Sequence, residues 1–209
     1  MKARYGWFTL LPGSPILSHS FRFGVESIKK IVDWTLQYLP PSANTSILEV
    51  GSGNGTLLFA LAEAGYAPTR LSGIDYSADA VKLAKSIALT RKSQEISFNM
   101  CDFLNEAPPL LSHMLQEIRQ DVWDLLLDKG TFDAIALGEK DESGRSPATR
   151  YPEHVAKSLK PGGYFLITCA FIVFATGILK HGCLMPLQLQ HVISLKTSCK
   201  PLSLQQKLA

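Results

Sequence analysis

The sequence has few cysteines and no pattern that would use them together. None forms a CxxC pair, and their spacing is not that of a zinc site. Dense disulfide frameworks occur mainly in small secreted domains. We therefore expect reduced thiols in a cytoplasmic protein, and no metal site. The four cysteines are Cys101, Cys169, Cys183 and Cys199.

Charged residues are also scarce, and the two signs nearly balance. Only 19% of the 209 residues are charged, the formal net charge is +3, and no dense run of lysine and arginine is present. Proteins that track nucleic-acid phosphates need such a run or a strongly basic patch. The sequence thus predicts no nucleic-acid partner.

Long uninterrupted hydrophobic runs are nearly absent. Near the start, a short apolar patch is broken by Pro12, Gly13 and Pro15, which disfavours a signal peptide. A second stretch, from Pro161 to Leu179, carries no charge and raises the alternative of a membrane span. Its first residues belong to an expected sheet strand, which leaves too few for an independent span of about 20 residues. We expect no membrane association.

What the chain does contain is a regular alternation of apolar strands and amphipathic helices. With 46% hydrophobic residues, it can bury one substantial core. The strands are mostly continuous hydrophobic runs, which is typical of burial on both faces. The order βαβαβ, followed by further α/β units, predicts a doubly wound, mostly parallel α/β sheet. Expected strands cover residues 47–50, 70–75, 96–102, 122–128 and 163–168, and expected helices cover 25–39, 56–65, the residues after Ser77 and 148–159.

A glycine-rich turn follows the first expected strand. Gly51, Gly53 and Gly55 permit a tight turn and a close approach of backbone to a ligand before a helix opens. The dinucleotide fingerprint G-x-G-x-x-G/A fails because Thr56 occupies its last position, and no Gly-Lys-Ser/Thr follows as in a P-loop. The turn therefore indicates a different ligand, with a purely structural turn as the alternative.

Two acids end the next two strands. Asp75 lies 20 residues after Gly55, where a carboxylate can accept both hydroxyls of a ribose. Asp102 ends the third strand. Such residues often only start turns, which is the structural alternative. Because the carboxyl ends of parallel strands share one edge, the glycine turn and both acids predict one ligand site.

The segments ILEVGSGNG, GIDYS and CDF resemble the cofactor site of the class I S-adenosylmethionine-dependent methyltransferases. The resemblance implies a Rossmann-like class I methyltransferase fold and S-adenosylmethionine as methyl donor. It further implies that the three glycines surround the methionine part of the cofactor and that Glu49 supports its ammonium. Asp75 would hold the ribose, Tyr76 would flank the adenine, and Asp102 would accept from the adenine amino group. Phe103, which follows in the CDF segment, completes the predicted cofactor-binding set.

The fourth expected strand ends in DKGTFDAI, residues 128–135. Many amino-methylating members of the superfamily have Asn/Asp-Pro-Pro-aromatic there, so its absence argues against nucleobase methylation. DKGTFDAI, with FGVES (23–27), Arg150-Tyr151 and LKPGGYFLIT (159–168), resembles the elongation factor 1-alpha lysine methyltransferase 2 family. The resemblance to the class I methyltransferases covers roughly residues 45–168. The resemblance to the lysine methyltransferase family implies a protein-lysine N-methyltransferase whose protein partner is translation elongation factor 1-alpha.

Methyl transfer to lysine needs a neutral amine, but a lysine of pKa about 10.4 is charged at pH 7, a deficit of about 4–5 kcal/mol. We predict that Asp128 binds the incoming ammonium and aims its nitrogen. Phe132 and Tyr151 would form aromatic walls for the methylated ammonium and complete the predicted catalytic set. The alternative for Asp128 is a strand-end residue that caps local backbone. For Lys129 the favoured interpretation is a solvated or structural side chain.

The two ends of the chain depart from the family pattern. We expect a divergent segment over 1–22, a methyltransferase core over 23–169 and a divergent tail over 170–209, which contains no acidic residue. The tail is interpreted as a rearranged terminal hairpin, a membrane anchor, or sequence from an altered splice or gene model. The sequence therefore leaves open whether the closing strand pair of the family is present. Two other functions stay open: methylation of another protein or a small molecule, and a non-catalytic, partner-binding or transport role.

Overall fold

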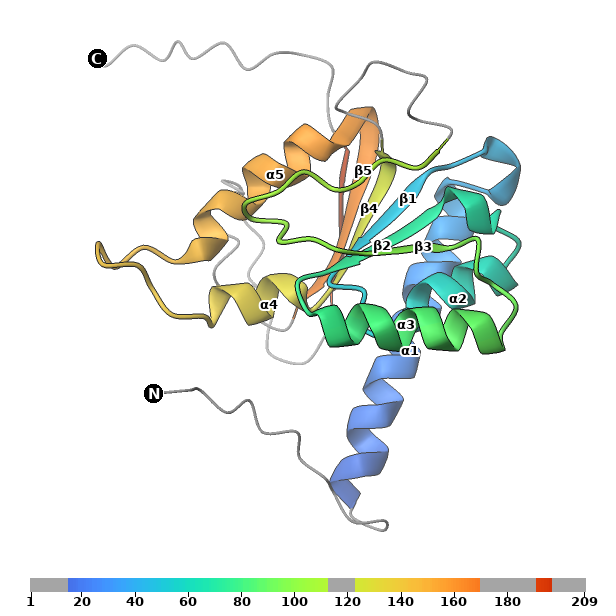
Figure 1. The fold of residues 1–209 in the computed structure, drawn as a ribbon, viewed down its shortest axis with the longest axis horizontal. Coiled ribbons are helices and arrows are strands. Elements are labelled where there is room, and N and C mark those ends of the chain that lie inside the picture. Colours follow the sequence, from blue (N-terminus) through green and yellow to red (C-terminus); the bar gives the residue numbers. More distant parts are fainter. Residues whose placement is uncertain (1–14, 113–122, 170–190, 197–209) are drawn as a thin grey trace.

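The structure is a computed structural model that describes residues 15–112, 123–169 and 191–196 (Figure 1). Within these ranges, six strands form one sheet in the order β3-β2-β1-β4-β5-β6. The first five strands pair in parallel, and β6 pairs antiparallel with β5. The strands are β1 (Ile47–Val50), β2 (Leu71–Asp75), β3 (Ser97–Met100), β4 (Trp123–Lys129), β5 (Leu159–Cys169) and β6 (His191–Lys196).

Described helices connect β1 to β2, β2 to β3 and β4 to β5, as βαβ crossovers between parallel strands require. The α-helices are α1 (Pro15–Tyr38), α2 (Thr56–Glu63), α3 (Ala78–Thr90), α4 (Thr131–Ala136) and α5 (Tyr151–Ser158). Short 3-10 helices cover Pro41–Ala43, Pro68–Arg70 and Pro147–Arg150. This arrangement confirms the predicted Rossmann-like, mostly parallel α/β fold.

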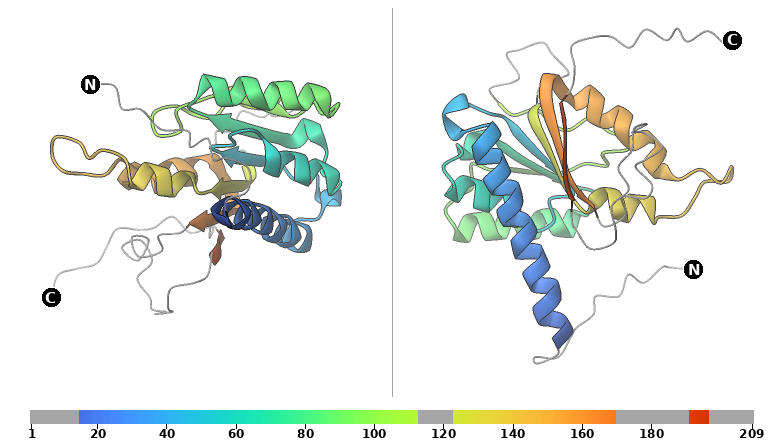
Figure 2. Two further views of the ribbon diagram at one scale, coloured as in Figure 1. Left: turned by 90° about the horizontal axis from the view of Figure 1, so that it is seen from below. Right: turned by 180° about the vertical axis from the view of Figure 1, so that it is seen from behind.

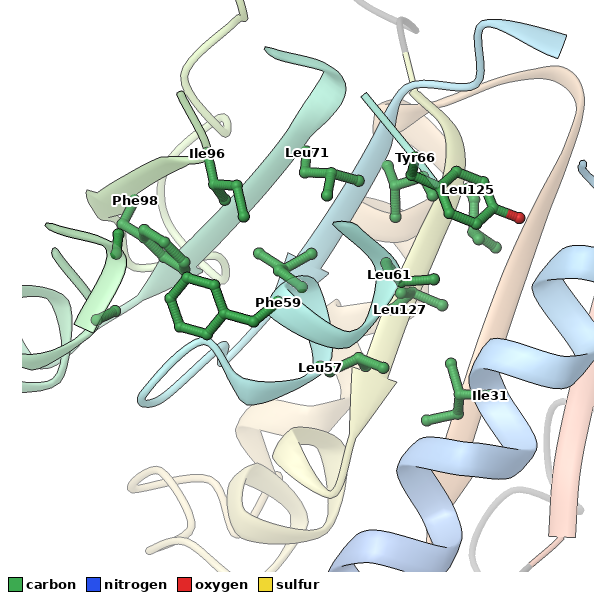
Figure 3. Packing of buried hydrophobic residues seen from close by; sticks show 14 of the residues in the cluster. Ile31, Leu57, Phe59, Leu61, Tyr66, Leu71, Ile96, Phe98, Leu125 and Leu127 are labelled. Atoms are coloured by element: carbon green, nitrogen blue, oxygen red, sulfur yellow. The ribbon is translucent and has the colours of Figure 1, made fainter. Parts of the chain in front are cut away.

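The strands bury both faces because successive side chains point to opposite sides of the sheet. On one face, Leu125 and Leu127 of β4 join a core with α1, α2 and α3, where Ile31 and Leu57 pack close by (Figure 3). On the other face, Leu126 lies in a second core with α5. Burying each such leucine contributes about 1.5–3 kcal/mol. Continuous apolar runs in the sequence are the direct result of this two-sided burial.

The first helix is longer than its pattern predicted. Its expected start was residue 25, but α1 begins at Pro15, a residue type that tolerates the first turn of a helix. It ends at Tyr38, ahead of Pro40, as the sequence indicated. The right-hand view of Figure 2 shows α1 running across one face of the sheet and continuing past the edge where the parallel strands end.

The last strand answers part of the question about the tail. β6 pairs with β5 from Tyr164↔Lys196 to Cys169↔His191, so one closing strand is present and covers the edge of β5. The rest of the expected divergent ends, residues 1–14, 170–190 and 197–209, lies outside the described residues. Among the helices that the structure describes, none combines the length and apolar character that a membrane crossing requires.

Parallel pairing brings the expected site residues to one edge of the sheet. Val50 pairs with Ile74 of β2 on one side and with Asp128 of β4 on the other. Asp75 in turn pairs with Met100, two residues before Asp102, the acid expected at the end of the third strand. The point where the strand order reverses, between β1 and β4, is the usual ligand site of a doubly wound sheet.

Candidate active site

The loop after β1 is held against its neighbours by backbone hydrogen bonds. The Ser52 N–H donates to the Ile74 carbonyl at 2.9 Å, and the Gly55 N–H donates to the Ser52 carbonyl at 2.9 Å. Gly51, Gly53 and Gly55 have φ values of 67°, 54° and 78°. These left-handed conformations are strained for residues with a Cβ. The local fold therefore requires the glycines even before any ligand is considered.

The three glycines nevertheless face different surroundings. A Cβ at Gly51 would lie 2.0 Å from Thr131 Oγ1, and one at Gly55 would lie 2.6 Å from Phe98 Cζ. At Gly53 a Cβ would meet nothing within 4 Å. Gly51 and Gly55 are thus needed for packing within the chain, whereas Gly53 presents backbone to open space. Of the three, Gly53 is best placed for a ligand to approach.

Asp75 ties the end of β2 to the glycine loop. Its side chain is buried, Oδ2 accepts from the Gly53 N–H at 2.9 Å, and Oδ1 accepts from the Ser77 N–H at 2.9 Å. Each carboxylate oxygen has capacity for a further donor. The carboxylate can therefore position the loop and still accept from vicinal hydroxyls of a ligand.

Glu49 is the most unusual charged group at this edge. Its side chain is 1% exposed, and Oε2 has no hydrogen-bond partner among the described residues. Burial raises the pKa of Glu49 to about 8, with Lys129 acting in the opposite direction and the carboxylates of Asp128 and Asp75 adding to the rise. Buried polar atoms are normally satisfied, so an orphaned oxygen needs an explanation. A ligand ammonium would supply both a donor and a compensating charge.

The remaining predicted cofactor residues divide into accessible and buried groups. Tyr76 is 78% exposed beyond the end of β2. Asp102 is also exposed, and its carboxylate accepts from the Leu104 N–H at 3.1 Å and from Asn105 Nδ2 at 2.7 Å. The Phe103 ring, by contrast, is buried against Tyr151, with ring centroids 5.3 Å apart. Only the backbone of Phe103 is therefore suited to the ligand contact predicted for it.

Asp128 is fully buried, and both of its oxygens are engaged within the chain. Oδ1 accepts from the Thr131 N–H at 2.7 Å, while Oδ2 accepts from the Phe132 N–H at 2.9 Å and from the Tyr151 hydroxyl at 2.5 Å. Burial raises the pKa of Asp128 to about 6, and these three hydrogen bonds act in the opposite direction. The geometry matches the capping alternative, and direct contact of Asp128 with an acceptor ammonium stays a prediction.

Tyr151 also differs from its expected role. It is 1% exposed, and its ring packs between Phe103 and Phe132, with centroid separations of 5.3 and 5.4 Å. In this geometry the Tyr151 side chain does not reach an open surface, and its place in an aromatic wall stays a prediction. Phe132 is half-buried and remains available for such a wall.

Thr131 was not singled out from the sequence, yet it connects the two halves of the site. Its hydroxyl donates to the Val50 carbonyl at 2.9 Å, immediately before the glycine loop. The only sequence signal was a threonine directly after Gly130, and such residues often serve a local turn alone. In the part of the chain described, no cluster of three or more His, Cys, Asp or Glu side chains is arranged to hold a metal.

Comparison with known proteins adds independent information. Residues 41–196 match a family described as a methyltransferase domain. Protein-lysine N-methyltransferase efm4 of Schizosaccharomyces pombe is 37% identical, with 70% of this chain and 63% of the relative covered. EEF1A lysine methyltransferase 2 of Homo sapiens is 33% identical, with 70% and 56% covered. The chain thus spans about three fifths of the length of these relatives.

A solved structure supports the fold alone. A protein from Pyrococcus horikoshii aligns with a TM-score of 0.54 at 17% sequence identity, covering 88% of this chain and 79% of that protein. At this identity the likeness concerns the arrangement of helices and strands, and the chemistry has to come from the residues of the site.

Proposed function

The chain belongs to the methyltransferase domain family, and we propose from this that it transfers a methyl group from S-adenosylmethionine to a lysine of translation elongation factor 1-alpha. The family resemblance of the sequence motifs is confirmed by relatives that bear the names EEF1A lysine methyltransferase 2 and protein-lysine N-methyltransferase. The observation that carries the cofactor assignment is the buried Oε2 of Glu49 beside the glycine loop, which has no hydrogen-bond partner within the described part of the chain.

The hydrogen-bonding groups of the described residues match those of S-adenosylmethionine. Glu49 Oε2 would accept from the ammonium of its methionine part, and the open side of Gly53 would admit that part close to the backbone. Asp75 would accept from the ribose hydroxyls, with Tyr76 and Asp102 on the adenine. When bound, the sulfonium supplies an electrophilic methyl group.

The acceptor side must deliver a neutral lysine amine. Asp128 is fully buried and already accepts three hydrogen bonds within the chain, so we propose that the proton of the lysine ammonium leaves to water and not to Asp128. Removing the amine from bulk water favours its neutral form, which lowers part of the cost of about 4–5 kcal/mol at pH 7. Phe132, half-buried at the start of α4, would provide the aromatic surface beside the methylated nitrogen.

The substrate proposal is tested by incubating the purified chain with elongation factor 1-alpha and isotopically labelled S-adenosylmethionine, followed by mass spectrometry of the product. We expect label on a single lysine. A parallel incubation with cell extract identifies the acceptor if the label appears instead on another protein or a small molecule. Mass spectrometry of elongation factor 1-alpha from cells lacking this protein completes the test, and an unaltered lysine methylation pattern would count against the proposal.

The non-catalytic alternative requires a separate measurement. Calorimetry with S-adenosylmethionine should show binding and a raised melting temperature, because a ligand that binds only the folded state stabilises it. Absence of both would favour a partner-binding role. We also propose a cytoplasmic location, where the elongation factor would be available as a substrate.

A further inference from the structure

Thr131 contacts the cofactor loop from the acceptor side of the site. Its hydroxyl donates to the Val50 carbonyl at 2.9 Å, and the same Oγ1 would lie only 2.0 Å from a Cβ at Gly51. Thr131 is also the first residue of α4. The start of the acceptor-side helix therefore rests directly on the start of the glycine loop.

Asp128 holds Thr131 in this position. One of its oxygens accepts from the Thr131 N–H, and the other accepts from the Phe132 N–H and the Tyr151 hydroxyl. Tyr151 begins α5, so four hydrogen bonds join the ends of β1 and β4 to the starts of α4 and α5. We name this network, made by Asp128, Thr131, Phe132, Tyr151 and Val50, the strand-end bracket.

We propose that the strand-end bracket is a positioning device, in which Thr131 and Asp128 fix the glycine loop relative to α4 without touching cofactor or acceptor. This inference rests on the proposed methyl transfer, since it deepens the account of the same site. In-line transfer requires the methyl group and the amine to be aligned closely, and misplacement of about 1 Å can cost a hundredfold in rate. A bracket between the two binding regions supplies that alignment.

The proposal concerns a hydrogen bond, which separates it from simple packing. Valine has nearly the shape of threonine but would leave the buried Val50 carbonyl without its Oγ1 donor. Serine keeps the donor but loses a methyl group. If Thr131 only fills space, valine should substitute well and serine poorly, whereas the strand-end bracket predicts the reverse order.

The experiment compares Thr131→Val with Thr131→Ser, and uses Thr90→Val as a matched control. Thr90 is exposed on α3 and donates to the Ser86 carbonyl at 3.2 Å, far along the chain from the loop. Calorimetry with S-adenosylhomocysteine should show affinity reduced about tenfold for Thr131→Val, equivalent to about 1.4 kcal/mol. The serine variant and the Thr90 control should stay within about twofold, as expected for an intact or remote hydrogen bond.

Hydrogen exchange in the free protein provides a readout that does not depend on the proposed reaction. The amides of Ser52 and Gly55 should exchange faster in Thr131→Val than in the wild type, and at the wild-type rate in Thr131→Ser. Melting temperatures of all variants are recorded alongside. Unchanged exchange and affinity in the valine variant, or a serine variant worse than valine, would overturn the inference. A wild-type chain that fails to bind S-adenosylhomocysteine would instead refute the proposed function, while exchange still decides whether Thr131 holds the loop.

Tyr151→Phe tests the acceptor side of the strand-end bracket. It removes one donor to Asp128 while keeping the ring that packs on Phe132. We expect kcat to fall about tenfold to a hundredfold, consistent with loss of one hydrogen bond to a charged group, with little change in KM for the protein acceptor. A raised KM with unchanged kcat would show that Asp128 binds the acceptor directly and would contradict a positioning role.

Discussion

Replacement of Glu49 by glutamine separates two effects of its buried charge: the loss of folding stability and the binding of a ligand ammonium. Glutamine has nearly the same shape but carries no charge at any pH. In the folded protein, burial raises the pKa of Glu49 to about 8 from 4.5, against the opposing effect of Lys129. The free protein at pH 7 therefore holds Glu49 mainly protonated, and ionisation has to be driven by a ligand cation.

The sign of the effect follows from the raised pKa. The folded state binds the Glu49 proton more tightly than the unfolded state, so the resulting stability is fully present below pH 4.5 and is lost as the pH rises through about 8. At 1.36 kcal/mol per pKa unit, the change across this window is about 5 kcal/mol. Glu49→Gln removes this loss, and the glutamine variant should become the more stable protein in alkaline buffer.

The assay is urea unfolding of both proteins between pH 5 and 9, with and without S-adenosylhomocysteine. Asp128, whose pKa is also raised, titrates in both proteins, so the difference between them isolates Glu49. Without ligand, the free energy of unfolding of the wild type should fall relative to Glu49→Gln as the pH rises. Ligand should reverse the order, because the ammonium stabilises only the ionised carboxylate.

The same reasoning predicts proton release on binding. At pH 7 the wild type should release close to one proton when S-adenosylhomocysteine binds, measured by calorimetry in buffers of different ionisation enthalpy, and Glu49→Gln should release none from this site. Parallel stability curves for the two proteins from pH 5 to 9, together with equal ligand affinity, would refute both the raised pKa and the role of Glu49 in holding an ammonium.

The site geometry makes further predictions for three variants. Gly51→Ala should lower the free energy of unfolding by more than the roughly 1–2 kcal/mol of left-handed strain alone, because its Cβ would lie 2.0 Å from Thr131 Oγ1. Gly53→Ala should lower the free energy of unfolding only by about that strain, yet it should weaken S-adenosylhomocysteine binding more than its small loss of stability would suggest. A Gly53→Ala variant that binds the ligand as tightly as the wild type would contradict the open approach at Gly53. Phe132→Leu should keep cofactor affinity but raise KM for the protein acceptor about fivefold, as loss of a cation–π contact of about 1 kcal/mol would, and steady-state kinetics check this.

The sequence was most informative where burial alone determines the structure. Apart from Glu49 and Asp75, residues 47–50 and 71–75 are apolar or small, and both ranges form fully buried central strands. β5 begins at Leu159, ahead of the predicted residue 163, because pairing of Trp123 with Leu159 extends the strand through Pro161 and Gly162. β6 was not located, since an antiparallel edge strand depends on a partner more than 20 residues away in the chain and has no long apolar run of its own.

For the site, the sequence located the residues but not the directions of their side chains. Topology alone brings Asp75 and Asp128 to one edge, because both end parallel strands. The donors that occupy Asp128 could not be foreseen, since Tyr151 lies 23 residues further along the chain. Packing between α4 and α5 decides whether the strand-end carboxylate accepts from a ligand or from a buried hydroxyl. This packing produces no periodic pattern in the sequence from which it could be predicted.

The order Asp128, Lys129, Gly130 and Thr131 follows from what each position must do. Asp128 lies on the face of β4 that packs with α5, and Gly130, at a φ of 85°, turns the chain so that two following N–H groups converge on that carboxylate. The intervening Lys129 points to the opposite face by strand alternation, the face of Glu49, whose pKa it lowers. Glu49 and Asp128 are thereby kept on opposite sides of one sheet.

This separation bears on where acceptor choice is made. Asp128, Thr131 and the Tyr151 hydroxyl are committed to one another, so they cannot also distinguish one acceptor from another by direct contact. If the proposed methyl transfer holds, selection has to come from the exposed and half-buried residues that follow them, beginning with Phe132 and continuing through the charged loop 139–145. Exchange of that loop for an uncharged segment should alter KM for the protein acceptor and leave cofactor affinity unchanged, because the strand-end bracket lies outside it.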